Sequence, residues 1–398
     1  MRLCFIAPHM LGTDQYSSLP STPTLAWGLI KKLIERGNNI SIITNSSDYL
    51  LKDNYPLEKV QIFPIISAGK AISVLKSTSH IVSQIKKIEP DVIHTYGDIS
   101  MSYFAILIKT LTKKPTVITV TRNFVGYSYP PYVVKTLSLG KGSSQNHTSF
   151  DLFKRKLLFT LDHIICCNNF VKQQIIGKEK VSDKISVVPH GIKNTFLVPI
   201  KHNNFILTHN KNKTILFLGD GSYSRGFYTF LFSIKDVLKE FPRTRFIAAI
   251  RGMNYHDSII AKKIEGNCNN LTIIDKAMTS DSLLKTIKTS DIIVLPFKIN
   301  AMEPPLTIIE SMSMGKPVIT TNVGGNKEII TNMVNGILIN PNSAHASKPI
   351  ISLLHDDQKR EKMGQLAQQS IRKKYNWNEC TNKILSIYET IKKDNSVS

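Results

Sequence analysis

The sequence predicts an α/β protein with two doubly wound parallel sheets, and three observations carry this prediction. Short runs rich in Ile and Val alternate with amphipathic stretches of helical period along most of the 398 residues. The apolar runs lack polar alternation, which is typical of parallel strands covered on both faces. The alternation stops in the polar segment 197–213 and then resumes, so the chain divides into two similar β–α series. Two such units would face each other across a cleft at the carboxyl ends of their strands.

The first series holds the strand candidates that precede the polar segment. Amphipathic stretches at 23–36, 73–88 and 100–112 lie between them and predict helices. The predicted strands are 2–7, 39–44, 60–65, 92–94, 116–120, 163–166 and 185–188.

The second series begins directly after the polar segment. Its first strand is followed by a helical pattern over 227–239. The predicted strands are 214–218, 245–250, 271–274, 291–295, 317–320 and 336–339.

Composition excludes several classes of protein. No apolar run reaches the roughly 18–20 residues that a membrane-spanning helix needs, so we expect a cytoplasmic protein. The five cysteines form no CxxC or Cys/His metal spacing, so we expect free thiols in a reducing compartment. No Ser/His/Asp or Cys/His nucleophile arrangement can be argued, so the catalytic residue stays unknown.

The formal net charge of +22 favours an anionic partner. Residues 99–150 contain six Lys or Arg and no acidic residue, together with Phe124, Tyr127, Tyr129 and Tyr132. This pattern fits either an anionic membrane surface or an ordinary solvated surface. No nucleic-acid-binding module is recognisable, so we expect no nucleic acid partner.

The segment Gly219–Gly226 follows an apolar strand and precedes a helical stretch. Gly219 and Gly221 would let backbone N–H groups approach a ligand, and Arg225 adds a forked cation suited to a diphosphate. An ordinary strand-to-helix turn explains the same residues, and there is no Walker A spacing.

A second candidate site lies at 303–317, after another buried strand. Pro304-Pro305 marks a helix start, and the N–H groups of Leu306 and Thr307 would face a phosphate. Glu310 could accept two hydrogen bonds from ribose hydroxyls, and Glu303 could hold a sugar hydroxyl. Helix capping and compensation of the helix dipole explain the two glutamates equally well.

Together these motifs resemble the retaining nucleotide-sugar glycosyltransferases of group 1, also called family four, which have the GT-B fold. The matching stretches are 36–44, 91–94, 188–192, 219–226, 303–318, 322–330, 335–336 and 375–377.

The resemblance implies a role for each half of the chain. The second Rossmann-like domain, 198–376, would bind a nucleotide diphosphate sugar through Gly219, Gly221, Arg225, Glu303, Pro305, Leu306, Thr307 and Glu310. The first, 1–197 with a returning helix at 377–398, would bind a saccharide or lipid-linked acceptor. Its acceptor-side residues would be Gly12, His94 and Thr121.

The same resemblance implies sugar transfer with retention of configuration, without a metal or other cofactor. The pathway would be glycan, polysaccharide or glycolipid biosynthesis, and the protein would be peripheral at the inner face of the membrane.

The sequence also departs from the family pattern at particular positions. Asp220 stands where the family usually has an arginine, and Thr121 stands near a usual histidine. Glu303 and Glu310 are separated by six residues rather than seven, so Met302 occupies the usual first position. These departures keep a second hypothesis open, in which the chain is an inactive GT-B scaffold that binds a nucleotide or a protein partner.

Overall fold

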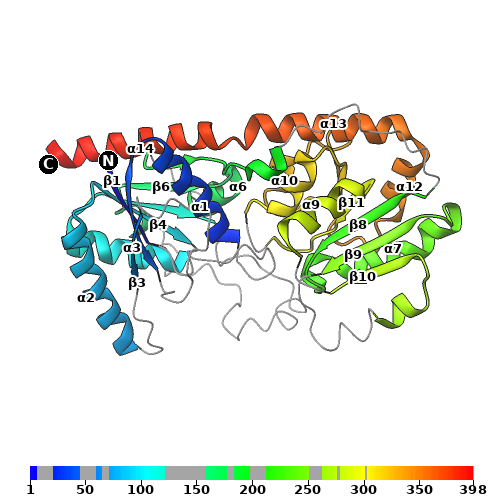
Figure 1. Ribbon diagram of the computed structural model, residues 1–398, viewed down its shortest axis with the longest axis horizontal. Helices are drawn as coiled ribbons and strands as arrows, with labels where there is room; N and C mark the ends of the chain where they lie inside the picture. The colour runs from blue at the N-terminus through cyan, green and yellow to red at the C-terminus, as the bar shows by residue number, and fades with distance from the viewer. Residues whose placement is uncertain are drawn as a thin grey trace.

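The computed structural model describes most of the chain. The described residues are 1–6, 21–44, 60–64, 71–97, 99–121, 157–176, 183–197, 212–250, 262–275, 278–300 and 303–397. They build two lobes that lie side by side, and the last two helices run along one edge of both (Figure 1). The predicted α/β fold with two parallel sheets is confirmed.

The first lobe is built on a seven-stranded sheet of order β3-β2-β1-β4-β5-β6-β7, in which every pairing is parallel. Only β4 differs much from its predicted bounds. It continues past His94 to Gly97 because Tyr96 and Gly97 pair with β5. The elements are β1 (Arg2–Ile6), α1 (Ser21–Glu35), β2 (Asn39–Thr44), β3 (Val60–Pro64), α2 (Ala71–Ile88), β4 (Val92–Gly97), α3 (Ile99–Thr112), β5 (Thr116–Val120), β6 (His163–Cys166), α6 (Asn169–Ile176) and β7 (Ile185–Val187).

The second lobe is built on a six-stranded parallel sheet of order β10-β9-β8-β11-β12-β13. A 3₁₀ turn, η2 (Asn194–Leu197), precedes it. Its elements are β8 (Thr214–Gly219), η4 (Tyr223–Arg225), α7 (Phe227–Glu240), β9 (Arg245–Ile250), β10 (Leu271–Ile274), α9 (Ser280–Thr289), β11 (Ile292–Leu295), α10 (Leu306–Ser313), β12 (Val318–Thr321), α11 (Asn326–Ile329), β13 (Ile337–Ile339), α12 (Ser347–His355) and α13 (Asp357–Lys374).

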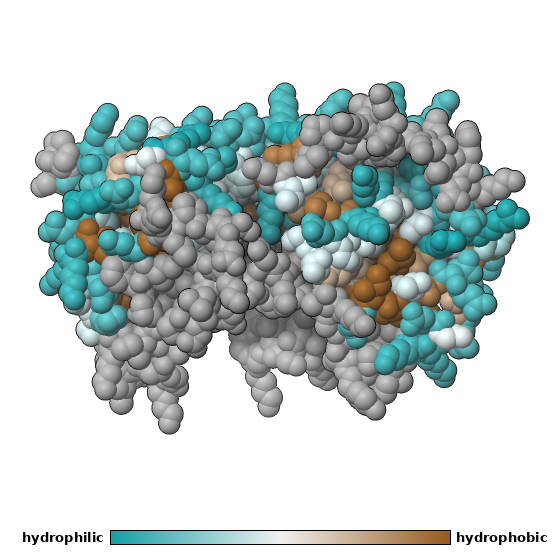
Figure 2. All heavy atoms as spheres, in the orientation of Figure 1, coloured by the Kyte–Doolittle hydropathy of each residue, from teal (hydrophilic) through white to brown (hydrophobic). Residues whose placement is uncertain are grey.

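The final helix, α14 (Trp377–Val397), returns to the first lobe. Trp377, Ile384 and Tyr388 share one buried cluster with Leu3 and Phe5 of β1. A methyl group at Gly28 of α1 or at Gly191 would overlap the Trp377 indole, so both glycines are needed to seat it. Hydrophilic side chains line the outer surface of α14 (Figure 2).

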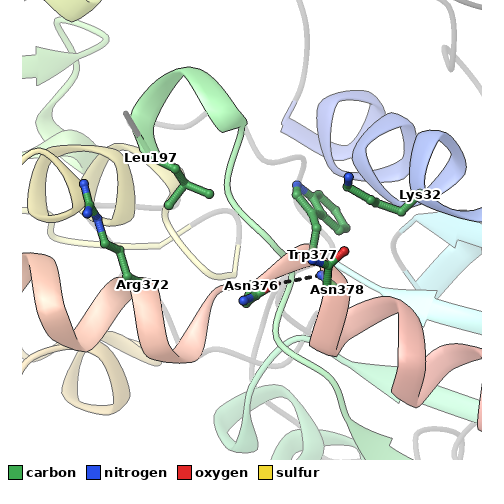
Figure 3. Close-up of a pocket in the computed structure, with 6 residues that line it drawn as sticks. All are labelled: Lys32, Leu197, Arg372, Asn376, Trp377 and Asn378. Atoms are coloured by element: carbon green, nitrogen blue, oxygen red, sulfur yellow. Dashed lines mark hydrogen bonds between the residues drawn. The ribbon is translucent and has the colours of Figure 1, made fainter. Parts of the chain in front are cut away.

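A pocket lies where α13 gives way to α14, on the side where the chain crosses between the lobes. Figure 3 shows the Trp377 indole between Lys32 of α1 on one side and Leu197 and Arg372 on the other. Its lining residues are Lys32, Leu197, Arg372, Asn376, Trp377 and Asn378.

The strand order sets where a ligand can bind. In the second sheet, β8 lies between β9 and β11, so the chain leaves β8 on one side and later returns on the other. Such a switch point opens a crevice at the carboxyl ends of the two strands. The loops that follow β8 and β11 are the two segments that carry the donor-side residues expected from sequence.

Candidate functional site

The loop after β8 is held against the end of β11. Gly226 has φ 75, and a methyl group there would overlap the carbonyl oxygen of Pro296. The backbone N–H groups of Lys298 and Ile299 both donate to the carbonyl oxygen of Ser224, at 2.9 and 3.2 Å. Gly219 is not crowded in this way, since the nearest atoms to an added methyl lie at 3.4 Å or more. Gly226 is therefore the glycine on which the shape of this loop depends.

Asp220 has a defined structural role in this loop. Its Oδ1 accepts a hydrogen bond from the Ser222 N–H at 3.1 Å, and its Oδ2 lies 3.4 Å from Nε of Arg225. The Arg225 guanidinium also lies over the Phe297 ring, 5.3 Å from its centroid. The acid that departs from the family pattern thus shapes the turn and pairs with the cation expected to meet a diphosphate.

Helix α10 starts where the proline pair predicts. Pro305 is its N-cap residue and makes no side-chain capping hydrogen bond. Leu306 and Thr307, which form the first turn, are partly exposed, whereas Glu310 is only 3% exposed. The helix start can therefore present N–H groups and the positive end of its dipole to an anion.

Glu303 lies just before α10 and is fully buried. Its Oε1 accepts hydrogen bonds from the Gly325 N–H at 3.1 Å and from Asn300 Nδ2 at 3.2 Å. Its Oε2 accepts from Asn168 Nδ2 of the first lobe at 2.7 Å. Burial raises the pKa of the Glu303 carboxyl to about 7, although these donors oppose the shift. Its carboxylate thus faces protein amides from both lobes.

His94 and Thr121, two of the residues expected on the acceptor side, are buried. Gly12 lies outside the described residues. His94 is buried in the first-lobe core, where one ring nitrogen meets the Tyr388 hydroxyl and the other lies 2.7 Å from Thr119 Oγ1. Burial lowers the pKa of His94 to about 3, so the ring is neutral. Since both nitrogens have partners inside the core, His94 packs the lobe rather than lining a cleft.

Thr121 lies at the junction between the lobes. It is fully buried, and its Oγ1 donates to the carbonyl oxygen of Gly97 at 3.3 Å. Its own carbonyl oxygen accepts a hydrogen bond from the Glu303 N–H at 3.2 Å. The structure therefore brings together Thr121 and Glu303, two residues that the sequence assigns to different domains.

Two residues of this region, Asn168 and Glu328, were not predicted from the sequence as site residues. Asn168 follows β6, and Glu328 lies on α11, where its carboxylate accepts hydrogen bonds from the backbone N–H groups of Asn169 and Phe170 at 2.9 and 2.6 Å. A polar residue directly after a buried strand was the available signal for Asn168. Within the described part of the chain, no group of three or more His, Cys, Asp or Glu side chains is arranged to hold a metal ion.

Two family models match consecutive stretches of the chain, one in each lobe. The model described as Glycosyltransferase Family 4 matches residues 23–195, and the model described as Glycosyl transferases group 1 matches residues 200–370. The chain belongs to the group 1, family 4 glycosyltransferases, for which retention of configuration is typical.

Three relatives illustrate the similarity. The chain is 27% identical over 223 residues to an uncharacterized glycosyltransferase of Methanocaldococcus jannaschii, covering 53% of this chain and 60% of that protein. It is 23% identical over 322 residues to the alpha-monoglucosyldiacylglycerol synthase of Streptococcus pneumoniae, covering 78% and 70%. It is 23% identical over 323 residues to the UDP-Gal:alpha-D-GlcNAc-diphosphoundecaprenol alpha-1,3-galactosyltransferase of Escherichia coli, covering 76% of each. The chain thus spans less than two thirds of the Methanocaldococcus protein.

Solved structures share the fold over nearly the whole chain. A glycosyltransferase from Rickettsia africae has a TM-score of 0.73 at 21% identity, covering 98% of both chains. Anabaena HepE in complex with UDP and glucose has a TM-score of 0.72 at 14% identity, covering 98% of this chain and 100% of that one. The expected GT-B fold is confirmed.

Proposed function

We propose that this protein transfers a sugar from a nucleotide diphosphate sugar to an acceptor hydroxyl, with retention of configuration and without a metal. The observation that carries the proposal is the meeting of two loops at the β8–β11 switch point. One loop brings Arg225, and the other brings the start of α10 with Glu310 one turn further along. A leaving diphosphate needs positive charge, and a ribose needs a hydrogen-bond acceptor.

The charge balance at this site supports catalysis without a metal. The Arg225 guanidinium and the N–H groups of Leu306 and Thr307 would meet the diphosphate as its charge develops. Asp220 reduces that positive charge, but it also orients Arg225 within the loop. The HepE complexes with UDP and the UDP-Gal enzyme among the relatives support a nucleotide-sugar donor.

A donor assay tests this function. UDP, GDP, ADP and CMP are first compared by the shift each causes in the unfolding temperature, since a bound ligand stabilises the folded state. Transfer or hydrolysis of the matching nucleotide sugars is then measured with and without EDTA. We expect activity that EDTA leaves intact and that Glu310→Ala lowers about 10- to 150-fold, since loss of a charge-assisted hydrogen-bond acceptor costs about 1.5–3 kcal/mol.

The matched control is Glu361→Gln, which changes an exposed glutamate on α13. It should leave activity unchanged. Equal activity of Glu310→Ala and wild type would remove Glu310 from the mechanism. Nucleotide binding without turnover of any donor would favour the inactive scaffold instead.

We further propose that the acceptor is lipid-linked and that α3 meets an anionic membrane surface. Leu107 and Leu111, one helical turn apart, are 38% and 49% exposed, and Lys113 and Lys114 follow at the helix end. An exposed apolar pair beside cations suits an anionic lipid interface. Two of the relatives carry a diacylglycerol or a diphosphoundecaprenol in their names. Residues 122–150 of this basic window lie outside the described residues.

Among the described residues, no helix has both the length and the apolar character that crossing a membrane requires. Vesicle flotation tests surface binding instead. Vesicles with phosphatidylglycerol should carry the protein and pure phosphatidylcholine vesicles should not, and Leu107→Ser with Leu111→Ser should abolish binding. Met333→Ser with Val334→Ser is the control, because these side chains are also about half exposed, at 50% and 48%, but lie on the second lobe. Equal flotation of both double variants would refute the surface.

A further inference from the structure

The second lobe holds the first turn of α6 with two carboxylates. Glu303 Oε2 accepts a hydrogen bond from Asn168 Nδ2 at 2.7 Å. Glu328 accepts from the backbone N–H groups of Asn169 and Phe170. These are N–H groups that the helix itself cannot satisfy, and the positive end of the helix dipole favours the Glu328 anion.

The Asn168 amide has a fixed orientation in this arrangement. Its Oδ1 accepts a hydrogen bond from the Val171 N–H at 2.9 Å, which caps α6 from within the first lobe. Its Nδ2 must therefore point toward Glu303. A flip of the amide would give up the cap and place the Asn168 oxygen against a carboxylate oxygen.

The second lobe is shaped around the Glu303 carboxylate. A methyl group at Gly324 or Gly325 would overlap that carboxylate, and one at Gly325 would also overlap the Asn168 amide. The other partners of Glu303 are both N–H donors, from Asn300 and Gly325. The contact is thus enclosed and directional, unlike an ion pair on an exposed surface.

Glu303 also connects this contact to the donor side. Only Pro304 and Pro305 separate it from α10, whose start and Glu310 carry the proposed donor site. We propose that Asn168, Glu303 and Glu328 form an interlobe clasp, which holds α10 in register with the first lobe and on which sugar transfer depends. Glu303 is then a positioning residue, not a donor ligand. The dependence of transfer on the clasp rests on the proposed function, whereas the clasp itself does not.

A swap of hydrogen-bond polarity tests the clasp. Asn168→Asp keeps the cap on Val171 but sets an oxygen against Glu303 Oε2. Glu303→Gln keeps an acceptor for Gly325 but sets an N–H group against Asn168 Nδ2. The double variant Asn168→Asp with Glu303→Gln restores one donor and one acceptor with the direction reversed, and above the raised pKa of Glu303 it conserves the total charge.

Three readouts are compared across wild type, both single variants and the double variant. They are kcat for donor turnover, the Kd of UDP, and hydrogen exchange of the α6 amides in the absence of ligand. We expect each single variant to lower kcat about 10- to 100-fold and to speed α6 exchange similarly, as a charge-assisted hydrogen bond is lost. The Kd of UDP should stay within about threefold, because the clasp lies outside the proposed donor contacts. The double variant should recover both kcat and protection.

Two results would overturn the clasp. One is additive loss in the double variant, with no recovery of α6 protection. The other is a Kd for UDP that weakens in proportion to kcat in Glu303→Gln, which would make Glu303 a donor contact. Failure of the proposed function is recognised separately: wild type would show no turnover of any donor, while the exchange pattern of α6 would still decide whether the clasp exists.

Discussion

At Gly226, a single added methyl group would meet both an unfavourable backbone conformation and a backbone atom. Its φ of 75 lies in the left-handed region, and the added methyl would overlap the backbone carbonyl of Pro296. Since that oxygen belongs to backbone next to a buried strand, it cannot rotate away. Gly226→Ala must therefore shift the loop after β8 away from β11.

The expected cost has two parts. The left-handed conformation costs a non-glycine residue about 1–2 kcal/mol. Overpacking against well-packed neighbours costs about 1–3 kcal/mol more. We therefore expect Gly226→Ala to lower the free energy of unfolding by about 2–5 kcal/mol, and to weaken UDP binding because Arg225 moves with the loop.

Two other glycines separate these parts. Gly37 has φ 78 but nothing within 4 Å of an added methyl, so Gly37→Ala should show only the conformational cost, about 1–2 kcal/mol. Gly266 lies outside the left-handed region and also has open space, so Gly266→Ala should change stability by less than about 0.5 kcal/mol.

Urea unfolding followed by far-ultraviolet circular dichroism measures the three variants, with nucleotide binding measured in parallel. We expect the free energy of unfolding to fall most in Gly226→Ala, less in Gly37→Ala and least in Gly266→Ala. If Gly226→Ala were no less stable than Gly37→Ala, the close approach of the two loops would have no energetic consequence.

The remaining predictions concern two buried side chains, His94 and Trp377, and the Arg225–Asp220 pair. Burial holds the pKa of His94 near 3, below its ordinary 6.5, so its contribution to stability is complete above pH 6.5 and is lost as the pH falls toward 3. Relative to His94→Gln, the free energy of unfolding of wild type should therefore fall by about 1.4 kcal/mol per pH unit over that window. The same pH dependence of the free energy of unfolding in both proteins, measured with urea, would refute this. Trp377→Ala should cost about 3–5 kcal/mol in a thermal or urea unfolding experiment, since the indole fills the space left by Gly28 and Gly191; a loss below 1 kcal/mol would contradict the packing. Arg225→Ala should weaken UDP binding about 10- to 100-fold in calorimetry. Asp220→Asn, which removes a weakly coupled negative charge, should strengthen UDP binding by less than about fivefold. Unchanged or tighter UDP binding in Arg225→Ala would show that Arg225 does not meet the diphosphate.

Several strands were predictable because they are short and mostly apolar, and β5, β6 and β11 are buried along their whole length. Residues 116–120, 163–166 and 245–250 show no polar alternation, and their predicted bounds match β5, β6 and β9. The end of β4 was less predictable, because Thr95, Tyr96 and Gly97 are polar or small. They are strand residues only through their pairing with β5, which is a tertiary contact.

The candidate site was predictable where its parts are local in sequence. The proline pair predicts the start of α10, and the glycine-bearing loop after β8 marks the other half. The partner of Glu303 was not predictable, because Asn168 is 135 residues away and no local pattern links the two. The structural role of Asp220 was not predictable either, because its contacts with Ser222 and Arg225 depend on how the loop folds.

A crystal structure of the protein with UDP bound addresses the proposed donor site most directly. We expect the diphosphate within hydrogen-bonding distance of the Arg225 guanidinium and of the N–H groups of Leu306 and Thr307, with the ribose hydroxyls on the Glu310 carboxylate. A nucleotide bound elsewhere, or one whose phosphates turn away from the start of α10, would contradict the assignment.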